Sequence, residues 1–271
     1  MDIRNCDAEA LLDSLDDNSI DLILTDPPYI ISKDSGMDKL AKRVAGGDSG
    51  PIRTENQWED FKKKHSSREY NEQDRTNFLQ WGHPTGKKFA VNTDYGDWDS
   101  QFTMEKLEKV LKKAYTKLRK GGTIIVWFDI WKLTLLYEMM DRCKFKQPRF
   151  IEWIKTNPQP LNSKRNYLTN CREIALLGVK GGTPTFNSEY DNSIYTYPLM
   201  GGKYRKHPTQ KSLELFKDII KKHSNEGDLV CDLFLGAGTT ARAAKETNRK
   251  FVGSELNENF YKIATEWASF P

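Results

Sequence analysis

Apolar and polar positions follow two different periods along this chain, and each period predicts one kind of element. Short apolar runs at Asp21 to Thr25 and Thr123 to Phe128 predict buried strands, whereas the spacing over Met104 to Leu118 predicts an amphipathic helix. By the same criteria we expect helices at Ala8 to Leu15, Ser212 to His223 and Thr239 to Thr247, and strands at Leu229 to Phe234 and Phe251 to Ser254. Strands that alternate with helices form a sheet covered on both faces. The pattern therefore predicts an α/β fold with a doubly wound, mostly parallel sheet.

Two stretches interrupt the alternation. Residues 33–100 are polar and weakly periodic, and the residues from about 155 to 206 mix basic and aromatic side chains. Loops of this length inside a compact domain are usually functional lids or disordered segments. Runs of charge often do no more than solvate a surface, so their basic character alone does not identify a binding segment.

Length and composition set only broad limits. The 271 residues are enough for one large domain, or for one domain with an appendage. A net charge of +4 does not by itself identify a nucleic-acid-binding protein. The start, MDIRNCDAEALL, has acids where a signal peptide has a basic leader, and the most apolar stretch, Thr123 to Met140, is broken by Asp129 and Lys132, so neither a signal peptide nor a membrane span is expected. The cysteines are dispersed, which fits a reduced cytoplasmic compartment and offers no paired metal ligands: Cys6, Cys143, Cys171 and Cys231.

The segment VCDLFLGAGTTARAAK, residues 230–245, reads as a strand, a glycine turn and a helix. This order lets a ligand lie against bare backbone at a helix N-terminus. Glu255 follows Gly236 by about 20 residues, at the end of the next expected strand, where a carboxylate can accept hydrogen bonds from ribose hydroxyls. The pair predicts a site for an adenosine compound. Gly236, Gly238 and Ala241 also satisfy the general dinucleotide pattern, so the loop alone leaves NAD open.

The segment LILTDPPYI, residues 22–30, delivers a second set of polar groups to the end of a strand. Asp26 offers one acceptor, and Pro28 restricts Pro27 to an extended conformation, which fixes the direction of the Pro27 carbonyl. Tyr29 adds a flat ring. An amino group on an aromatic ring needs two acceptors for its hydrogens and a face to stack on, as an extruded nucleobase does. Holding such an amine beside an electrophile supplies proximity and electrostatic placement.

Together the motifs TDPPY, DLFLGAGTT and KHPTQKS resemble those of the amino-methyltransferases that move a methyl group from S-adenosylmethionine to an exocyclic amine of DNA. The catalytic motif precedes the glycine loop, which is similar to the beta group of that family. The resemblance implies a Rossmann-like methyltransferase fold with circularly shifted motif order and inserted DNA-recognition loops. It also implies the domain organisation: residues 1–32, 102–180 and 203–271 as the catalytic domain, 33–101 as an insertion that contacts DNA or is flexible, and 181–206 as a target-recognition segment.

The resemblance further implies roles for individual residues. Asp26 and the Pro27 carbonyl would hold the target amine, with Tyr29 stacked on a flipped base, so the catalytic set is Asp26, Pro27, Pro28 and Tyr29. Lys211 would pair with a carboxylate, whereas Gln210 and Ser212 stand where an acid and a proline are frequent. The expected cofactor-binding set is Asp7, Asp26, His207, Thr209, Gln210, Lys211, Ser212, Asp232, Phe234, Gly236, Gly238, Thr239, Thr240 and Glu255, with no metal.

The family's tendency to pair an aspartate before the two prolines with adenine favours adenine N6 as the target, and cytosine N4 is the alternative by the same mechanism. A nicotinamide-dependent oxidoreductase and an inactive DNA-binding relic also remain open. The expected partners are double-stranded DNA and a second copy of the chain in a homodimer. The expected setting is cytoplasmic, in a bacterium, phage or similar host. Basic residues available for phosphates are Lys62, Lys63, Lys64, Arg165 and Arg205.

Overall fold

The computed structural model describes residues 1–28, 53–65, 69–81, 84, 102–158, 170–201 and 210–270. The chain divides into two compact units: Met1–Tyr29 together with Phe102–Pro271, and Ile30–Gln101. Of the expected site residues, Tyr29, His207 and Thr209 lie outside the described residues. The domain boundaries that the sequence suggests for recognition segments stay predictions.

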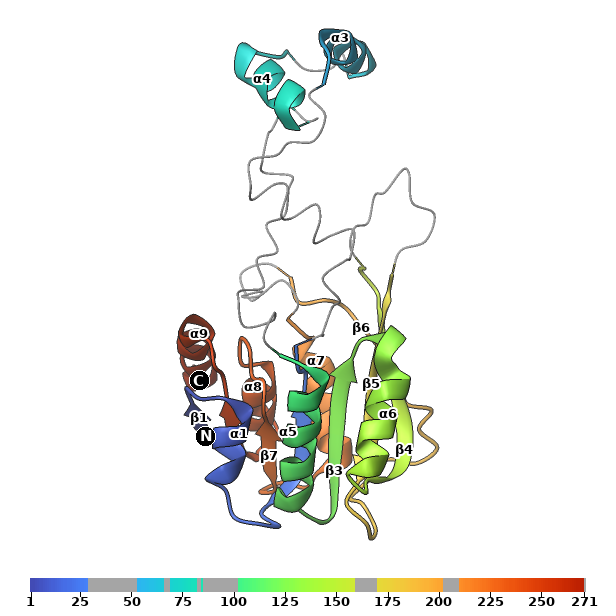
Figure 1. The fold of residues 1–271 in the computed structure, drawn as a ribbon, viewed down its shortest axis with the longest axis vertical. Helices are drawn as coiled ribbons and strands as arrows, with labels where there is room; N and C mark the ends of the chain where they lie inside the picture. The colour runs from blue at the N-terminus through green and yellow to red at the C-terminus, as the bar shows by residue number, and fades with distance from the viewer. Residues whose placement is uncertain are drawn as a thin grey trace. The chain divides into compact units, whose positions relative to one another are not determined.

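Among the described residues of the larger unit, eight strands form one sheet in the order β1-β8-β7-β2-β3-β5-β4-β6 (Figure 1). Neighbours from β1 to β3 run parallel, β5 runs antiparallel to both β3 and β4, and β4 and β6 are parallel. The predicted α/β fold with a mostly parallel sheet is confirmed. The strands are β1 Asp2–Arg4, β2 Ile20–Thr25, β3 Leu118–Phe128, β4 Lys146–Lys155, β5 Arg172–Val179, β6 Ile194–Tyr197, β7 Leu229–Asp232 and β8 Lys250–Ser254.

Helices cover both faces of this sheet (Figure 1). One layer contains α1 (Ala8–Asp13), α5 (Met104–Lys117) and α6 (Leu133–Arg142), and the short 3-10 helix η2 (Ile130–Lys132) precedes α6. The other layer contains α7 (Leu213–His223), α8 (Thr239–Glu246) and α9 (Glu258–Ser269), with α8 in contact with both α7 and α9. The two layers bury both faces, which explains why the central strands are continuous apolar runs.

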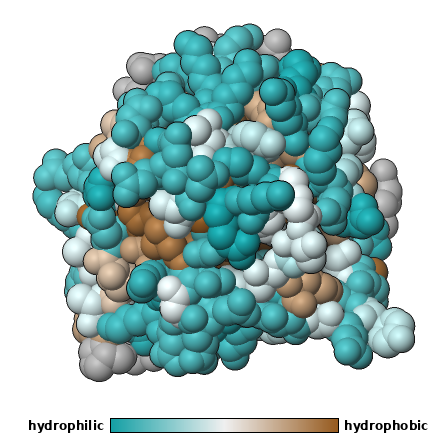
Figure 2. All heavy atoms as spheres, turned by 90° about the horizontal axis from the view of Figure 1, so that it is seen from below, coloured by the Kyte–Doolittle hydropathy of each residue, from teal (hydrophilic) through white to brown (hydrophobic). Residues whose placement is uncertain are grey.

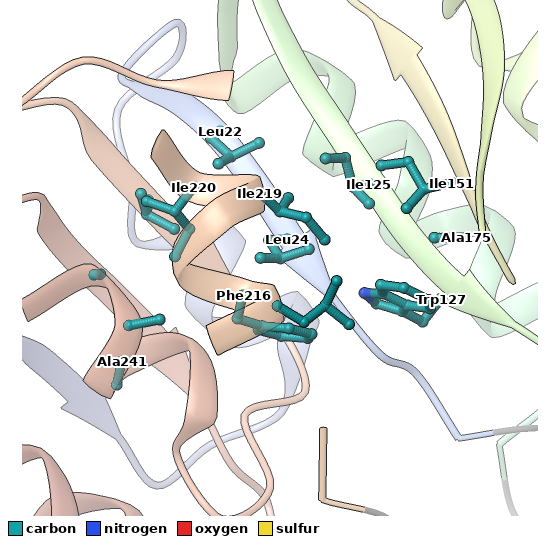
Figure 3. Close-up of a cluster of buried hydrophobic side chains, with 14 of the residues drawn as sticks. Leu22, Leu24, Ile125, Trp127, Ile151, Ala175, Phe216, Ile219, Ile220 and Ala241 are labelled. Carbon is teal, nitrogen blue, oxygen red and sulfur yellow. The ribbon is translucent and has the colours of Figure 1, made fainter. Parts of the chain in front are cut away.

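The core under α7 is built from alternate residues of neighbouring strands (Figure 3). Because side chains of a strand alternate between the two faces, Leu22 and Leu24 of β2 share one face, as do Ile125 and Trp127 of β3. The Trp127 ring stacks on the ring of Phe216, with ring centroids 6.2 Å apart. Each fully buried side chain of this kind stabilises the fold by about 1.5–3 kcal/mol relative to an exposed one. Others in the cluster are Ile151, Trp153, Ala175, Leu177, Leu215, Ile219, Ile220 and Ala241.

The loops at the amino ends of the parallel strands hold one another through polar contacts. The ammonium group of Lys180 donates hydrogen bonds to the carbonyl oxygens of Thr116 and Leu118, at 2.9 and 2.8 Å. Seen from this end, the surface is mainly hydrophilic around a limited hydrophobic area (Figure 2). These contacts close the end of the sheet opposite to the one where the predicted site residues lie.

The smaller unit contains two described helices, α3 (Glu55–Lys64) and α4 (Glu72–Trp81). Thr54 and Gln57 form a capping box at the start of α3. The buried ring of Trp58 lies 5.2 Å from that of Phe78, which joins the two helices through an aromatic contact. An insertion that the sequence described as weakly periodic therefore has a small aromatic core of its own.

The structure corrects one expectation about the chain's organisation. The stretch from about 155 to 206, read as an interruption of the fold, contains β5 and β6, which are strands of the sheet. The apolar run Ile174 to Val179 is the interior of β5, which pairs with both β3 and β4. Among the described residues, no helix combines the length and the apolar character needed to span a membrane.

Candidate active site

The predicted site residues gather at one edge of the sheet, the carboxyl ends of its parallel strands. Asp7 follows β1, Glu255 follows β8, the glycine loop follows β7 and Asp26 follows β2. These four strands are consecutive neighbours in the sheet. Ligands of open α/β sheets bind at this edge, so the topology brings motifs from both ends of the chain to one place.

The two glycines of the loop are required for different reasons. Gly236 has a φ of +54°, and a Cβ added there would meet no heavy atom within 4 Å. Among the described residues, nothing therefore covers its backbone. Gly238 has a φ of +94°, and a Cβ there would lie 2.9 Å from the Cα atom of Ala264 in α9. Gly236 suits close approach by a ligand, whereas Gly238 lets α8 pack against α9.

Glu255 is tied to the glycine loop. Its Oε2 atom accepts a hydrogen bond from the backbone N–H of Gly236, and its Oε1 atom accepts one from Asn257, each at 2.7 Å. Burial raises the pKa of this carboxyl, against the effect of these backbone donors. Because each carboxylate oxygen has two lone pairs, both oxygens retain acceptor capacity for hydroxyl groups. The position fits the predicted contact with a ribose.

Asp7 lies at the same edge, one strand further out. Its Oδ1 atom accepts a hydrogen bond from the backbone N–H of Ala10 at 2.7 Å, which makes Asp7 the N-cap of α1. The backbone N–H of Glu255 donates to the carbonyl of Arg4 at 3.0 Å, so the ends of β1 and β8 are joined. Asp7 and Glu255 thus follow neighbouring strands at the same edge of the sheet, and a contact of Asp7 with an adenine stays a prediction.

Asp232 connects the elements around the glycine loop through hydrogen bonds, and we call this set of contacts the clamp. Its Oδ1 atom accepts hydrogen bonds from the Thr25 hydroxyl at 2.8 Å and from the Phe234 backbone N–H at 3.1 Å, and its Oδ2 atom accepts one from the Thr240 hydroxyl. Full burial raises the pKa of Asp232 to about 6, although these donors oppose the increase. Asp232 and Thr240 therefore act between the protein's own elements, and they shape the loop from below.

Aromatic side chains flank the loop. The ring of Phe234 meets that of Phe102 edge-on, with centroids 5.2 Å apart. Phe102 is the first residue of the larger unit after the smaller one. Sequence reasoning named Phe234 but missed Phe102, because a single aromatic residue before a helix carries no signal of its own. Thr239 is buried at the start of α8.

Asp26 forms an ion pair with Lys211. The Nζ atom of Lys211 lies 2.7 Å from Asp26 Oδ2 and 2.7 Å from Glu173 Oε2. The Nζ atom of Lys155 lies 2.6 Å from Glu173 Oε1. Four alternating charges therefore run from Lys155 through Glu173 and Lys211 to Asp26. We call these four residues the charged row.

Glu173 is the central acid of the charged row, and sequence reasoning did not single it out. Burial would raise the pKa of Glu173, but the ammonium groups of Lys211 and Lys155 outweigh burial and hold that pKa below its ordinary value. Lys211, expected to pair with a carboxylate of the cofactor, lies between two carboxylates of the protein. Its side chain is only 6% exposed. A contact between Lys211 and the cofactor stays a prediction.

The remaining expected residues surround these groups. Pro27 is buried and Pro28 half-buried, and neither belongs to a helix or strand. Gln210 is buried, with its Nε2 atom 3.4 Å from the sulfur of Met200. Ser212 is the buried N-cap residue of α7, without a side-chain capping bond. In the part of the chain that the structure describes, no group of three or more His, Cys, Asp or Glu residues could hold a metal ion.

Comparison with known proteins identifies the family. A family model described as DNA methylase matches residues 20–266, which include Asp26, the charged row and the glycine loop. This chain belongs to the DNA methylase family. The match confirms the predicted resemblance to DNA amino-methyltransferases, and it decides against a nicotinamide-dependent oxidoreductase.

Curated DNA methylases show the same relationship. The Type II methyltransferase M2.DpnII of Streptococcus pneumoniae is 30% identical over 200 residues, covering 65% of this chain and 72% of that protein. The Type II methyltransferase M2.LlaDCHI of Lactococcus lactis subsp. cremoris is 26% identical over 285 residues, covering 96% and 86%. Both alignments span most of the relative, so the similarity is not confined to one motif.

Solved structures support the fold. The M1.HpyAVI–SAM complex superposes with a TM-score of 0.63 at 22% identity, covering 99% of both chains. The cytosine-N4-specific PvuII DNA methyltransferase gives a TM-score of 0.65 at 16% identity, covering 99% of this chain and 86% of the other. At such low identity these likenesses establish the arrangement of the sheet and helices.

Proposed function

We propose that this DNA methylase transfers a methyl group from S-adenosylmethionine to the exocyclic N6 amine of an adenine in DNA. The observation that supports the proposal most directly is that hydrogen bonds link the Asp26-Pro27-Pro28-Tyr29 segment to the glycine loop. Thr25, the residue directly before Asp26, donates to Asp232 at 2.8 Å and accepts from the backbone N–H of Leu233 at 3.2 Å. The amine-binding motif and the glycine loop are therefore fastened together at the point where their ligands would meet.

The residues fit the methyl donor. Gly236 offers backbone that no other described residue covers, and the buried carboxylate of Glu255 has the acceptor capacity that ribose hydroxyls require. When bound, S-adenosylmethionine supplies a methyl group on a positively charged sulfur. Phe102 and Phe234 provide an aromatic wall at the loop. The roles of Asp7, Gln210 and Thr239 in holding the cofactor are part of the same proposal, as are those of His207 and Thr209.

Asp26 and the Pro27 carbonyl act on the target amine. Each accepts one of its hydrogens, which favours a tetrahedral nitrogen with its lone pair directed away from the two acceptors. The nitrogen releases one proton when it is methylated, and in this proposal the Asp26 carboxylate, which already accepts a hydrogen bond from the amine, would receive it. Tyr29, directly after Pro28, would stack on the extruded base. Proximity and fixed charge then supply most of the acceleration.

The identity of the methylated base is tested by its product. Purified protein, S-adenosylmethionine carrying a labelled methyl group and unmodified genomic DNA are incubated, and the DNA is digested to nucleosides for mass spectrometry. The proposal predicts label in N6-methyldeoxyadenosine. Label in N4-methyldeoxycytidine would establish the alternative target, and no label in DNA would establish the inactive relic.

The biological setting follows from the relatives, which are named Type II methyltransferases. We infer that this protein modifies DNA in a restriction-modification system in the cytoplasm. Double-stranded DNA is the proposed substrate, and a homodimer the proposed assembly. Sequencing of host DNA with modification-sensitive reads would give the recognition sequence, and sedimentation of the purified protein would give its oligomeric state.

A further inference from the structure

The charged row is continuous with the hydrophobic core under α7. Asp26 follows Leu24 by two positions, and Lys155 follows Trp153 by two, while Glu173 precedes Ala175 by two. Since side chains two apart in a strand share a face, Lys155 and Glu173 project from the face that packs on α7, and the contact with Lys211 places Asp26 beside them. β5 runs antiparallel to β3, so its amino end brings Glu173 to the edge where the parallel strands end. Lys211 reaches the row from the segment before α7.

Glu173 bridges two lysines with separate oxygens. Its Oε1 atom meets Lys155 and its Oε2 atom meets Lys211, at 2.6 and 2.7 Å. Trp127 and Trp153, whose rings are fully buried, lie 5.7 Å from the Nζ atom of Lys211 and 5.4 Å from that of Lys155, respectively. Each ammonium group therefore has an acid on one side and an aromatic ring on another. Both lysine tails are fixed in position.

The fixed position of Lys211 matters for Asp26. The carboxylate torsion of an aspartate is broad, so an isolated carboxylate samples many orientations. Lys211 holds Oδ2 of Asp26 at 2.7 Å and thereby fixes that torsion. A lysine side chain has several rotatable bonds and three donors, so one contact alone does not hold it still. The contact with Glu173 adds a second carboxylate partner and restricts that freedom further.

We propose that Glu173 is a positioning residue for DNA methylation, which anchors Lys211 and through it orients the Asp26 carboxylate toward the target amine. The inference rests on the proposed role of Asp26. Lys155 completes the anchor because it balances the charge of Glu173. The row then contains two acids and two bases, and its buried charges compensate one another.

The test removes the charges of Glu173 and Lys155 together, so that neither is left as an unpaired buried charge. The double variant Glu173→Gln with Lys155→Met keeps the net charge of the row and leaves the residues Lys211 and Asp26 themselves unchanged. We expect the single-turnover methylation rate at saturating DNA and S-adenosylmethionine to fall about 10- to 100-fold, as a small misplacement of a reacting group does. The dissociation constant for S-adenosylmethionine should stay within about 3-fold, because the cofactor loop is untouched.

The matched control is Glu152→Gln with Arg172→Met. This ion pair also joins β4 and β5, with Arg172 Nε 3.2 Å from Glu152 Oε1. Its two residues lie on the opposite face of these strands from Glu173 and Lys155. The control should methylate at the rate of the unmodified protein. An equal loss of rate in control and test variants would show that the strands need ion pairs only for stability, and would overturn the proposal. An unchanged rate in the test variant would overturn it as well.

A second readout needs no activity. Lys211 is 6% exposed, so amine labelling by acetic anhydride, followed by peptide mass spectrometry, should spare it in the unmodified protein and in the control. We expect faster labelling of Lys211 in the test variant, and equal protection in all three proteins would contradict the anchoring. If the unmodified protein transferred no methyl group to DNA, the proposed function would fail, and this labelling would still decide whether Glu173 holds Lys211.

Discussion

Two buried carboxylates at the same edge of the sheet are held in opposite ways. Asp232, after β7, accepts from two hydroxyl groups and one backbone N–H, and its pKa rises to about 6 through burial. Glu173, at the amino end of β5, lies between two ammonium groups, which hold its pKa below its ordinary value. Around Asp232 the neutral donors do not compensate the loss of hydration of the charged carboxylate, whereas around Glu173 the two ammonium groups do.

The comparison separates two tasks. The clamp around Asp232 joins β2, β7 and α8 and so shapes the cofactor loop. The two lysines of the charged row hold the pKa of Glu173 low, and Lys211 also contacts the Asp26 carboxylate beside the proposed amine site. Asp232 has neutral donors and holds structural elements together, whereas Glu173 has charged partners and belongs to the row that reaches Asp26.

The largest effect is expected from Asp26→Ala. Removing the carboxylate takes away one acceptor of the target amine and leaves Lys211 without that partner. We expect the single-turnover methylation rate to fall by at least about 100-fold, comparable to the loss of a preorganised electrostatic group. Label transfer to DNA measures the rate. If the variant retained more than about a tenth of the activity, Asp26 would not be the amine-binding residue.

Asp232→Asn tests the other carboxylate through pH. Between pH 3.8 and 6 the folded protein binds a proton at Asp232 that the unfolded chain has released, so the contribution of this group to stability falls as pH rises. The shift corresponds to about 3 kcal/mol. Asparagine can still accept from Thr25 and can donate to the Thr240 hydroxyl, so the variant should fold. We expect it to lose this pH-dependent contribution, as measured by urea unfolding from pH 4 to 7.

The Asp232 comparison must be made against the unmodified protein at each pH. Burial lowers the pKa of His223 to about 4, so the unfolded chain binds more protons at that residue below pH 6.5, and its contribution to stability falls as pH falls. The two effects oppose each other in the unmodified protein. Parallel stability curves for Asp232→Asn and the unmodified protein would contradict the raised pKa.

The smallest effect is expected from substitutions in the smaller unit, and it concerns the salt dependence of DNA binding. Lys62, Lys63 and Lys64 form the last turn of α3, and replacing all three by glutamine should reduce the salt dependence of DNA binding. The slope of log affinity against log salt should fall by about 0.9 for each lysine that contacts a phosphate. Glutamine at the exposed positions Lys106, Lys109 and Lys112 of α5 is the matched control. Equal slopes for both triple variants would remove α3 from the DNA-binding surface.

The sequence predicted the parts of the site that chain-local patterns specify. The strand before Asp26 and the strand, turn and helix around Gly236 have periodic signals, and their carboxyl ends meet as the α/β pattern requires. Glu173 could not be found in this way. Its position at the edge depends on the reversed direction of β5, and its partner Lys155 comes from another strand. Such contacts arise from tertiary topology.

The inserted residues 30–101 also contain contacts that the sequence pattern did not predict. Polar side chains cover α3 and α4, and their short lengths leave only a weak period, so the chain reads as a loop there. The aromatic contact between Trp58 and Phe78 joins residues of two helices. Gly238 is a further example, because its requirement for glycine comes from Ala264 in α9 and cannot be read from the loop itself.

The division of tasks between the two regions is tested most directly by isothermal titration of S-adenosylmethionine into Asp26→Ala and Glu255→Ala. Glu255 is proposed to bind the ribose, and hydrogen bonds to charged groups contribute about 1.5–3 kcal/mol each. The account predicts at least about 10-fold weaker binding to Glu255→Ala and binding to Asp26→Ala within about 3-fold of the unmodified protein. Equal loss in both variants, or unchanged binding to Glu255→Ala, would contradict it.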